Sequence, residues 1–188
     1  MLKQSRELSS KIKIAMEHEK TDFSTTDYYF YSRYSIFTLK ALRKYAFQEF
    51  LYRMLKSESI PEKKVDSVKI EVFPAPRKNG FTIAGKCNTI RGKIRIYPKT
   101  VKFCAAFKKK YGKDILVAYA GNRARASLMH ELLHLKYVSD EEKVRALTKT
   151  YFSSFTKGFA NNSNSESMYK LIFDATTSPP CNLKAFDP

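Results

Sequence analysis

The sequence of 188 residues is poor in cysteine, and its three cysteines (Cys87, Cys104 and Cys181) lie far apart without a CxxC pair. A disulfide-rich secreted scaffold needs many more cysteines, and a zinc ribbon needs paired ones, so both classes are excluded. Tryptophan is absent. Long apolar runs are missing too: the longest, Ile115 to Ala120, is far shorter than the roughly 20 residues that span a membrane.

The N-terminal segment has no apolar stretch of the kind that marks a secretory signal, because Lys11 and Lys13 follow a charged start. We therefore expect a cytoplasmic protein with reduced thiols and no membrane segment. Its hydrophobic content of 43% is ordinary for a globular domain. A chain of this length can bury a core without cross-links. The composition does not indicate an oligomeric state.

Acidic residues are scarce: 18 Asp and Glu stand against 35 Lys and Arg, which gives a formal net charge of +17. An excess of this size indicates anionic partners, chiefly nucleic acid. Basic residues gather in three places, which are Tyr28 to Tyr52 (between aromatic residues), Lys108 to Lys110, and the strand with Arg91, Lys93 and Arg95. A solvated surface also produces such runs, so nucleic acid is one candidate partner among others.

The hydrophobic pattern divides the chain into three parts. Residues 1–60 have helical spacing, first at Ile12, Ala15 and Met16 and then in one long helix that ends before Pro61. Ser24, Thr25 or Thr26 is expected to cap that helix. Residues 61–157 combine short strands with helices, and residues 158–188 form a polar linker and a tail.

Three strands are predicted where apolar and polar residues alternate, over Val68–Phe73, Phe81–Gly85 and Lys93–Tyr97. The last two are expected to pair around Asn88 to Gly92. Three helices follow, from about Thr100 to Tyr111, from Asp114 or Asn122 to Tyr137, and from near Ser139 to Phe155. The order of helices, a small antiparallel sheet and further helices predicts an α+β fold.

Residues 130–134, His-Glu-Leu-Leu-His, form an HExxH motif in a segment with helical flanks. The i, i+4 spacing places both imidazoles on one helix face, where they can bind one tetrahedral Zn²⁺. Glu131 cannot easily bind the same ion, but it can take a proton from a metal-bound water, as a general base in amide hydrolysis does. The motif predicts a zinc site with His130 and His134 as ligands and Glu131 as the catalytic base. Chance spacing of surface histidines is the alternative, and the apolar helix disfavours it.

A catalytic zinc needs a third protein ligand and one position open to water. No histidine follows His134, and the natural alternative is a carboxylate. On a helical projection Glu142 points away from the apolar face, Glu141 lies at its edge and Asp140 lies closer in. Ser139 and Glu142 also fit a capping box, which gives Glu142 a structural role. We rank Glu141 first, then Asp140 and Glu142; acidic residues also simply favour a helix N-terminus.

The HExxH segment followed by Glu141, Val144, Leu147 and Thr148 resembles the helix pair of small gluzincin-like metallopeptidases, which include minimal zincins and the metallopeptidases of phages and mobile elements. In that family the helix after the HExxH helix carries the third zinc ligand, a role that the resemblance assigns to Glu141. The resemblance implies a zincin-like core over residues 61–157 and hydrolysis of peptide bonds in a peptide or protein substrate.

The segments Gly85–Cys87 and Gly92–Pro98 are similar to strands of SprT-like proteases. In zincins such a strand precedes the active-site helix and pairs with the extended substrate. The alternative function is a nucleic-acid-associated protein, either a protease that acts on DNA-bound proteins or a zinc-stabilised binding module. Cys181 in the tail is a further candidate zinc ligand that would keep the enzyme latent. Oxyanion stabilisation would need a side chain such as Tyr97, Tyr137 or Tyr151, although each is more simply a packed aromatic.

Overall fold

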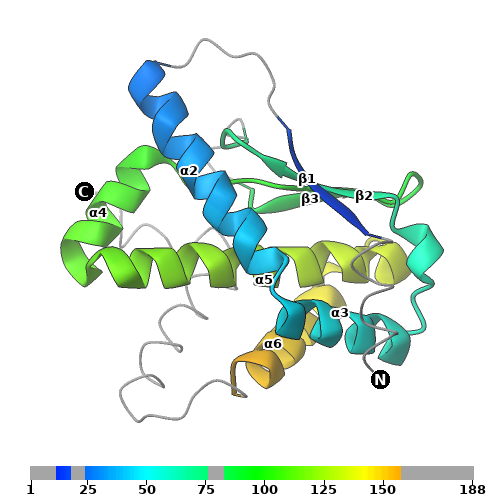
Figure 1. Cartoon of the computed structure of the whole chain (residues 1–188). Coiled ribbons are helices and arrows are strands. Elements are labelled where there is room, and N and C mark those ends of the chain that lie inside the picture. Colours follow the sequence, from blue (N-terminus) through cyan, green and yellow to red (C-terminus); the bar gives the residue numbers. More distant parts are fainter. Residues whose placement is uncertain (1–11, 18–23, 76–82, 158–188) are drawn as a thin grey trace.

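A four-stranded sheet with helices packed on one face makes up the described part of the computed structural model, residues 12–17, 24–75 and 83–157 (Figure 1). The strands are β1 (Lys13–Glu17), β2 (Ser67–Glu71), β3 (Gly85–Asn88) and β4 (Lys93–Ile96). The helices are α2 (Thr25–Leu42), α3 (Tyr45–Ser57), α4 (Val101–Tyr111), α5 (Lys113–Tyr137) and α6 (Glu141–Lys157), with a 3-10 turn at Glu62–Lys64. The predicted α+β class is confirmed.

The sheet is mixed, so the prediction of an antiparallel sheet is wrong. Its strand order is β1-β2-β4-β3, and β2 pairs in parallel with both β1 and β4. Only β3, at the edge, runs antiparallel to its neighbour β4. The predicted pairing around Asn88 to Gly92 is confirmed, but its first strand is Gly85–Asn88 and not the predicted Phe81–Gly85, which shares only Gly85 with it. The Asn88 side chain accepts a hydrogen bond from the Arg91 N–H (2.9 Å) in the turn. The antiparallel prediction followed from this hairpin alone, because β1 was not recognised as a strand.

The segment that contains Ile12, Ala15 and Met16 forms β1, so the predicted helix there is wrong. Ile12 and Ile14 are buried, whereas Lys13 and Ala15 are exposed, a period of two that fits a strand. A stretch of five residues is too short for its apolar spacing to distinguish a helix from a strand, and pairing with β2 decides the outcome.

The long helix expected before Pro61 is divided into α2 and α3 at Arg43–Lys44. The Gln48 side chain donates to the Leu42 carbonyl (2.6 Å), one of the acceptors left free where α2 ends. The Arg43 guanidinium donates to the Ile14 carbonyl (2.6 Å), which ties the break to β1. Ser24 is the N-cap of α2, in agreement with one of the three predicted caps.

The later helices follow the prediction closely. Thr100 caps α4 through its side-chain oxygen, which accepts from the Phe103 N–H (3.3 Å), and Gly112 ends it with a φ of +88°. α5 begins close to Asp114, the earlier of its two predicted starts, and not at Asn122. No described helix combines the length and the apolar character needed to cross a bilayer.

One apolar cluster joins the sheet to α3, α5 and α6. Its largest fully buried side chains include Phe47, Leu51, Ile70, Ile94, Leu128 and Phe152. Burial of each side chain of this kind contributes roughly 1.5–3 kcal/mol. The cluster contains residues from both the predicted N-terminal region, 1–60, and the predicted core, 61–157. The predicted linker and tail over 158–188 lie outside the described residues.

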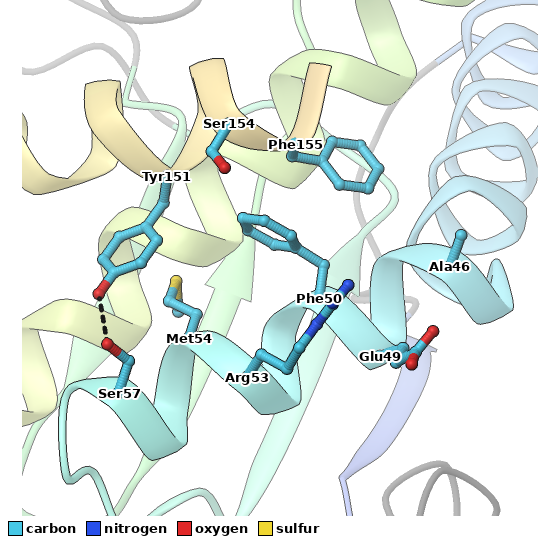
Figure 2. Close-up of a pocket in the computed structure, with 9 residues that line it drawn as sticks. All are labelled: Ala46, Glu49, Phe50, Arg53, Met54, Ser57, Tyr151, Ser154 and Phe155. Carbon is cyan, nitrogen blue, oxygen red and sulfur yellow. Dashed lines mark hydrogen bonds between the residues drawn. The ribbon is translucent and has the colours of Figure 1, made fainter. Parts of the chain in front are cut away.

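A buried carboxylate links the ends of α3 and α5 to the middle of α6. Glu58, the C-cap of α3, has a side chain only 10% exposed. It accepts hydrogen bonds from the hydroxyls of Tyr137 at the end of α5 (2.6 Å) and Tyr151 in α6 (2.5 Å). The Lys136 ammonium donates to the Glu58 backbone carbonyl (2.7 Å). Figure 2 shows Tyr151 above Ser57 at a hollow of about 540 Å³ between α3 and α6.

We expect Glu58→Gln to lower the free energy of unfolding by about 1–3 kcal/mol at pH 7, because two partly buried tyrosine hydroxyls lose a charged acceptor. Burial raises the pKa of Glu58, but hydrogen bonds from Tyr137 and Tyr151 and the charge of Lys136 lower it, and the net pKa lies below 4.5. Because the folded-state pKa is depressed, this stabilisation is present above about pH 4.5 and is lost as the pH falls through the folded-state pKa.

Urea unfolding at pH 7 and at acidic pH measures this effect, with Glu49→Gln on the same helix as the matched control. The free-energy difference between Glu58→Gln and the native chain should shrink at acidic pH. Equal stability of the two at pH 7 would show that the carboxylate does not hold the helix ends together.

Candidate metal centre

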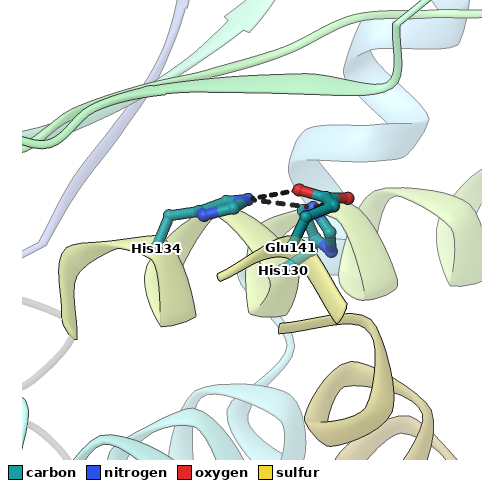
Figure 3. Close-up of side chains that lie close together, drawn as sticks. All are labelled: His130, His134 and Glu141. Atoms are coloured by element: carbon teal, nitrogen blue, oxygen red, sulfur yellow. Dashed lines mark hydrogen bonds and ion pairs between the residues drawn. The ribbon is translucent and has the colours of Figure 1, made fainter. Parts of the chain in front are cut away.

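His130 and His134 project from one face of α5 toward the same point in space (Figure 3). Their Nε2 atoms lie 3.2 Å apart. The side chains are 23% and 14% exposed, so both rings are held by packing while their tips remain accessible. The opposite face of α5, with Leu128 and Leu132, is in the core. One turn of a rigid, buried helix therefore sets the separation of the two imidazoles.

Glu141, the first residue of α6, completes a three-residue cluster with the two histidines (Figure 3). Its two carboxylate oxygens lie 3.5 Å from His130 Nε2 and 3.2 Å from His134 Nε2. One ligand atom from each residue lies within 4.8 Å of the others. Two nitrogens and an oxygen thus converge from two helices.

These distances fit a tetrahedral zinc ion. Ligand atoms about 2.0–2.1 Å from a tetrahedral Zn²⁺ are about 3.3 Å apart. The separation of the two Nε2 atoms, 3.2 Å, is close to that value, and each Nε2 lies 3.2–3.5 Å from one of the two Glu141 oxygens. Two imidazoles and one carboxylate are also a donor set of catalytic zinc sites, which keep the fourth position for water.

Each imidazole is oriented through its other nitrogen. His134 Nδ1 donates to the Val138 carbonyl (2.7 Å), which leaves Nε2 with a free lone pair. His130 Nδ1 lies 3.4 Å from the Thr148 hydroxyl, which itself donates to the Val144 carbonyl (2.7 Å) and so can accept from the ring. Such contacts fix the ring tautomer and raise the affinity for a metal.

A turn of only three residues, Val138 to Asp140, connects α5 to α6. Val138 has a φ of +40°, a conformation that is costly for a β-branched residue. Its N–H donates to the His134 carbonyl (2.9 Å), and its own carbonyl accepts from the His134 ring. Val138 therefore ends α5 and orients the His134 ring. The short turn places Glu141 next to the two histidines.

Glu131 lies between α5 and the edge strand β3 and is 7% exposed. A Cβ atom on Gly85 would lie 2.7 Å from Glu131 Oε1, so only glycine leaves room for this carboxylate. Burial raises the pKa of Glu131 to about 8; the charge of Glu141 adds to the rise, and a hydrogen bond from the Cys87 backbone opposes it. At pH 7 this carboxyl is therefore largely protonated in the metal-free protein, and a Zn²⁺ bound nearby would favour the ionised form that accepts a proton.

The surroundings of His130 keep its imidazole in the metal-binding form. Burial lowers the pKa of His130 to about 4; Glu141 opposes the shift, while His134 and Arg145 add to it. His130 is therefore a neutral imidazole at pH 7, which is the form that binds metals. Arg145 Nε donates to Glu141 Oε1 (2.8 Å), one helical turn away, and positions that carboxylate.

Asp140 and Glu142, the alternatives for the third ligand, do not join the cluster. The Asp140 carboxylate accepts from the Lys143 N–H (3.1 Å), so it caps α6 itself. The predicted capping box with Ser139 as N-cap is therefore wrong by one residue. Glu142 is exposed. Among the described residues that could hold a metal ion, only His130, His134 and Glu141 converge.

The tyrosines considered for oxyanion stabilisation have other partners. The hydroxyls of Tyr137 and Tyr151 donate to Glu58, and the Tyr97 side chain is hydrogen-bonded to Arg95. Cys181 lies outside the described residues. The hollow between α3 and α6 contains none of the candidate ligands, so the ligand cluster rather than that cavity marks the site.

Sequence reasoning missed the roles of Thr148, Val138 and Gly85. Thr148 follows Glu141 by seven residues, two turns of the same helix, and that spacing could have placed its hydroxyl near the cluster. Gly85 lies in a strand, where an isolated glycine often marks a close approach of another group. No sequence signal identifies Val138, because β-branched residues normally avoid its conformation.

Comparisons with known proteins do not add to this geometry. No protein-family model, curated protein or solved structure matches the chain.

We expect the chain to bind one zinc ion, and Glu141→Gln to weaken zinc binding by more than about 10-fold, because loss of a ligand costs at least as much as loss of a second-sphere contact. Metal competition titrations followed by elemental analysis measure the affinity and the stoichiometry. Glu142→Gln, the matched change one residue later, should bind zinc like the native chain. Equal zinc affinity of the two variants would exclude Glu141 as a ligand.

Proposed function

We propose that this protein is a zinc-dependent metallopeptidase, with His130, His134 and Glu141 as the zinc ligands and Glu131 as the general base. One observation carries the proposal: ligand atoms of His130, His134 and Glu141 lie within 4.8 Å of one another, and a buried Glu131 lies on the same helix turn as the histidines. This is the arrangement expected of a zincin-like site.

Bound zinc would act as a Lewis acid on the scissile carbonyl and lower the pKa of the attacking water. His130 and His134 would hold the ion through Nε2, with Thr148 and the Val138 carbonyl fixing their rings. Glu131 would accept the proton of the attacking water and pass it to the departing amine nitrogen. Its burial against Gly85 restricts the carboxylate to a narrow range of positions.

The edge strand β3 favours an extended peptide as the substrate. The Ala84 carbonyl accepts from the Tyr97 N–H (3.0 Å), so alternate residues of β3 bond to β4. The backbone groups of Gly85 and the Cys87 carbonyl therefore face the open edge, while the Cys87 N–H donates to Glu131. A peptide that adds to this edge as a further strand would lie next to Glu131. Zincins use an edge strand in the same way.

A purely structural zinc site is less well supported. Structural zinc normally has four protein ligands, whereas the described residues supply three. A buried carboxylate beside the cluster also has no purpose in a structural site, because burial of an acid without a charged partner costs stability.

We expect Glu131→Gln to reduce hydrolysis of an unfolded protein substrate by at least about 100-fold, because the amide cannot take a proton. Zinc content should stay at one per chain, since Glu131 is not a ligand. Mass spectrometry of casein digests measures cleavage, and Glu142→Gln is the matched control. A fully active Glu131→Gln variant would disprove the assigned role.

A second variant tests the same residue through its packing. Gly85→Ala should sharply reduce hydrolysis because its Cβ would lie 2.7 Å from Glu131 Oε1 and displace that carboxylate. Zinc affinity should change little. Thr89→Ala, in the exposed turn after β3, serves as the control. Native activity in Gly85→Ala would show that catalysis does not depend on the position of Glu131 against β3.

A further inference from the structure

The face of the sheet that points away from the helices is rich in basic residues. Apolar side chains such as Ile14, Val68 and Ile94 point toward the core, so their neighbours along each strand point outward. The outward set on the strands, together with the β3–β4 turn, contains six cations, which we call the basic sheet face: Lys13, Lys69, Lys86, Arg91, Lys93 and Arg95.

The strand register aligns these cations in two rows across the sheet. Lys69 of β2 lies opposite Arg95 of β4, which lies opposite Lys86 of β3. The second row places Lys13 of β1 and Lys93 of β4 on either side of Ser67. Neighbouring strands are about 4.8 Å apart, so the first row puts three positive charges on adjacent strands.

This alignment costs stability, and acidic residues offset only part of it. Like charges directly opposite each other destabilise a strand pair. Glu17 pairs with Lys69, and Glu71 Oε1 lies 3.4 Å from Arg95 Nε. Within the described ranges no carboxylate forms an ion pair with the other four cations, which are Lys13, Lys86, Arg91 and Lys93.

Structural explanations do not account for the whole basic sheet face. Lysines on edge strands prevent aggregation between sheets, which explains Lys13 on β1 and Lys86 on β3. β2 and β4 are internal strands, so protection of edges does not apply to Lys69 or Lys93. In contrast, Lys108 to Lys110 occupy the last turn of α4, where positive charge stabilises the helix.

We propose that the basic sheet face binds the phosphodiester backbone of nucleic acid. Rows of cations on a sheet match a polymer with regularly repeated negative charge. The net charge of +17 also attracts the whole chain to such a polymer. The outward residues of the described strands and of the β3–β4 turn include no aromatic side chain, so base stacking contributes little and sequence preference is weak. The surface lies across the sheet from α5, and the proposal therefore does not depend on the metallopeptidase assignment.

The experiment measures binding of the full chain to a fluorescein-labelled 20-base-pair DNA duplex by anisotropy, between about 50 and 200 mM salt. The test variant combines Lys13→Gln, Lys86→Gln and Lys93→Gln. The control removes the same charge from α4 by Lys108→Gln, Lys109→Gln and Lys110→Gln. Urea unfolding of both checks that they remain folded, and the sheet-face variant should be no less stable than the native chain, because it relieves repulsion.

We expect steeply salt-dependent binding by the native chain. The slope of log affinity against log salt should be smaller by about 2–3 in the sheet-face variant, since each phosphate contact contributes about 0.9. The α4 variant should keep the native slope. Three results would overturn the proposal: no binding at 50 mM salt, an unchanged slope in the sheet-face variant, or binding to polyglutamate but not to DNA.

Lysine acetylation of the native chain gives an answer that does not depend on any variant. Bound duplex should protect Lys13, Lys86 and Lys93 from the reagent and leave Lys108 to Lys110 reactive, as mass spectrometry would record. The reverse pattern would place the contact on α4 and overturn the proposal.

Discussion

The three-residue turn between α5 and α6 is the constraint on which the candidate centre depends. It leaves α6 no freedom to start elsewhere, so the first side chain of that helix meets the two histidines of the preceding one. Val138 carries the conformational cost of this turn, of order 1–3 kcal/mol. The cost is offset by contacts on either side: the His134 ring bonds to Val138, and Asp140 caps α6.

Two buried carboxylates with opposite surroundings flank this turn. Glu58 is surrounded by donors, and its contacts with Tyr137 and Tyr151 hold the helix ends in the orientation that the turn requires. Glu131 has a hydrogen bond from the strand backbone but no described cation paired with it. The first environment favours the charged form and rigid packing; the second favours exchange of a proton. These surroundings support a structural role for Glu58 and the proposed catalytic role for Glu131.

The sequence predicted the elements that have strong local signals. The HExxH helix, α4 with its Thr100 cap and Gly112 stop, and β4 appear where periodicity and turn residues place them, whereas β3 lies later in the chain than predicted. Convergence of Glu141 with the histidines agrees with the ranking, although the metal itself stays a prediction. β1 and the parallel pairing of β2 were missed because both depend on contacts distant in sequence, which local spacing does not encode. The strained Val138 was missed because its conformation is set by the turn, against its own preference.

The four residues of β3 make several different contacts. Gly85 provides space for a carboxylate, the backbone of Cys87 bonds to it, and Lys86 faces the other side of the sheet. The outer edge stays unpaired in the described fold, at the end of the strand order. These three contacts belong to adjacent residues, so a substitution that changes one of them also changes the surroundings of the other two. We infer that β3 tolerates fewer amino-acid types than the apolar core, where residues of similar volume exchange at small cost.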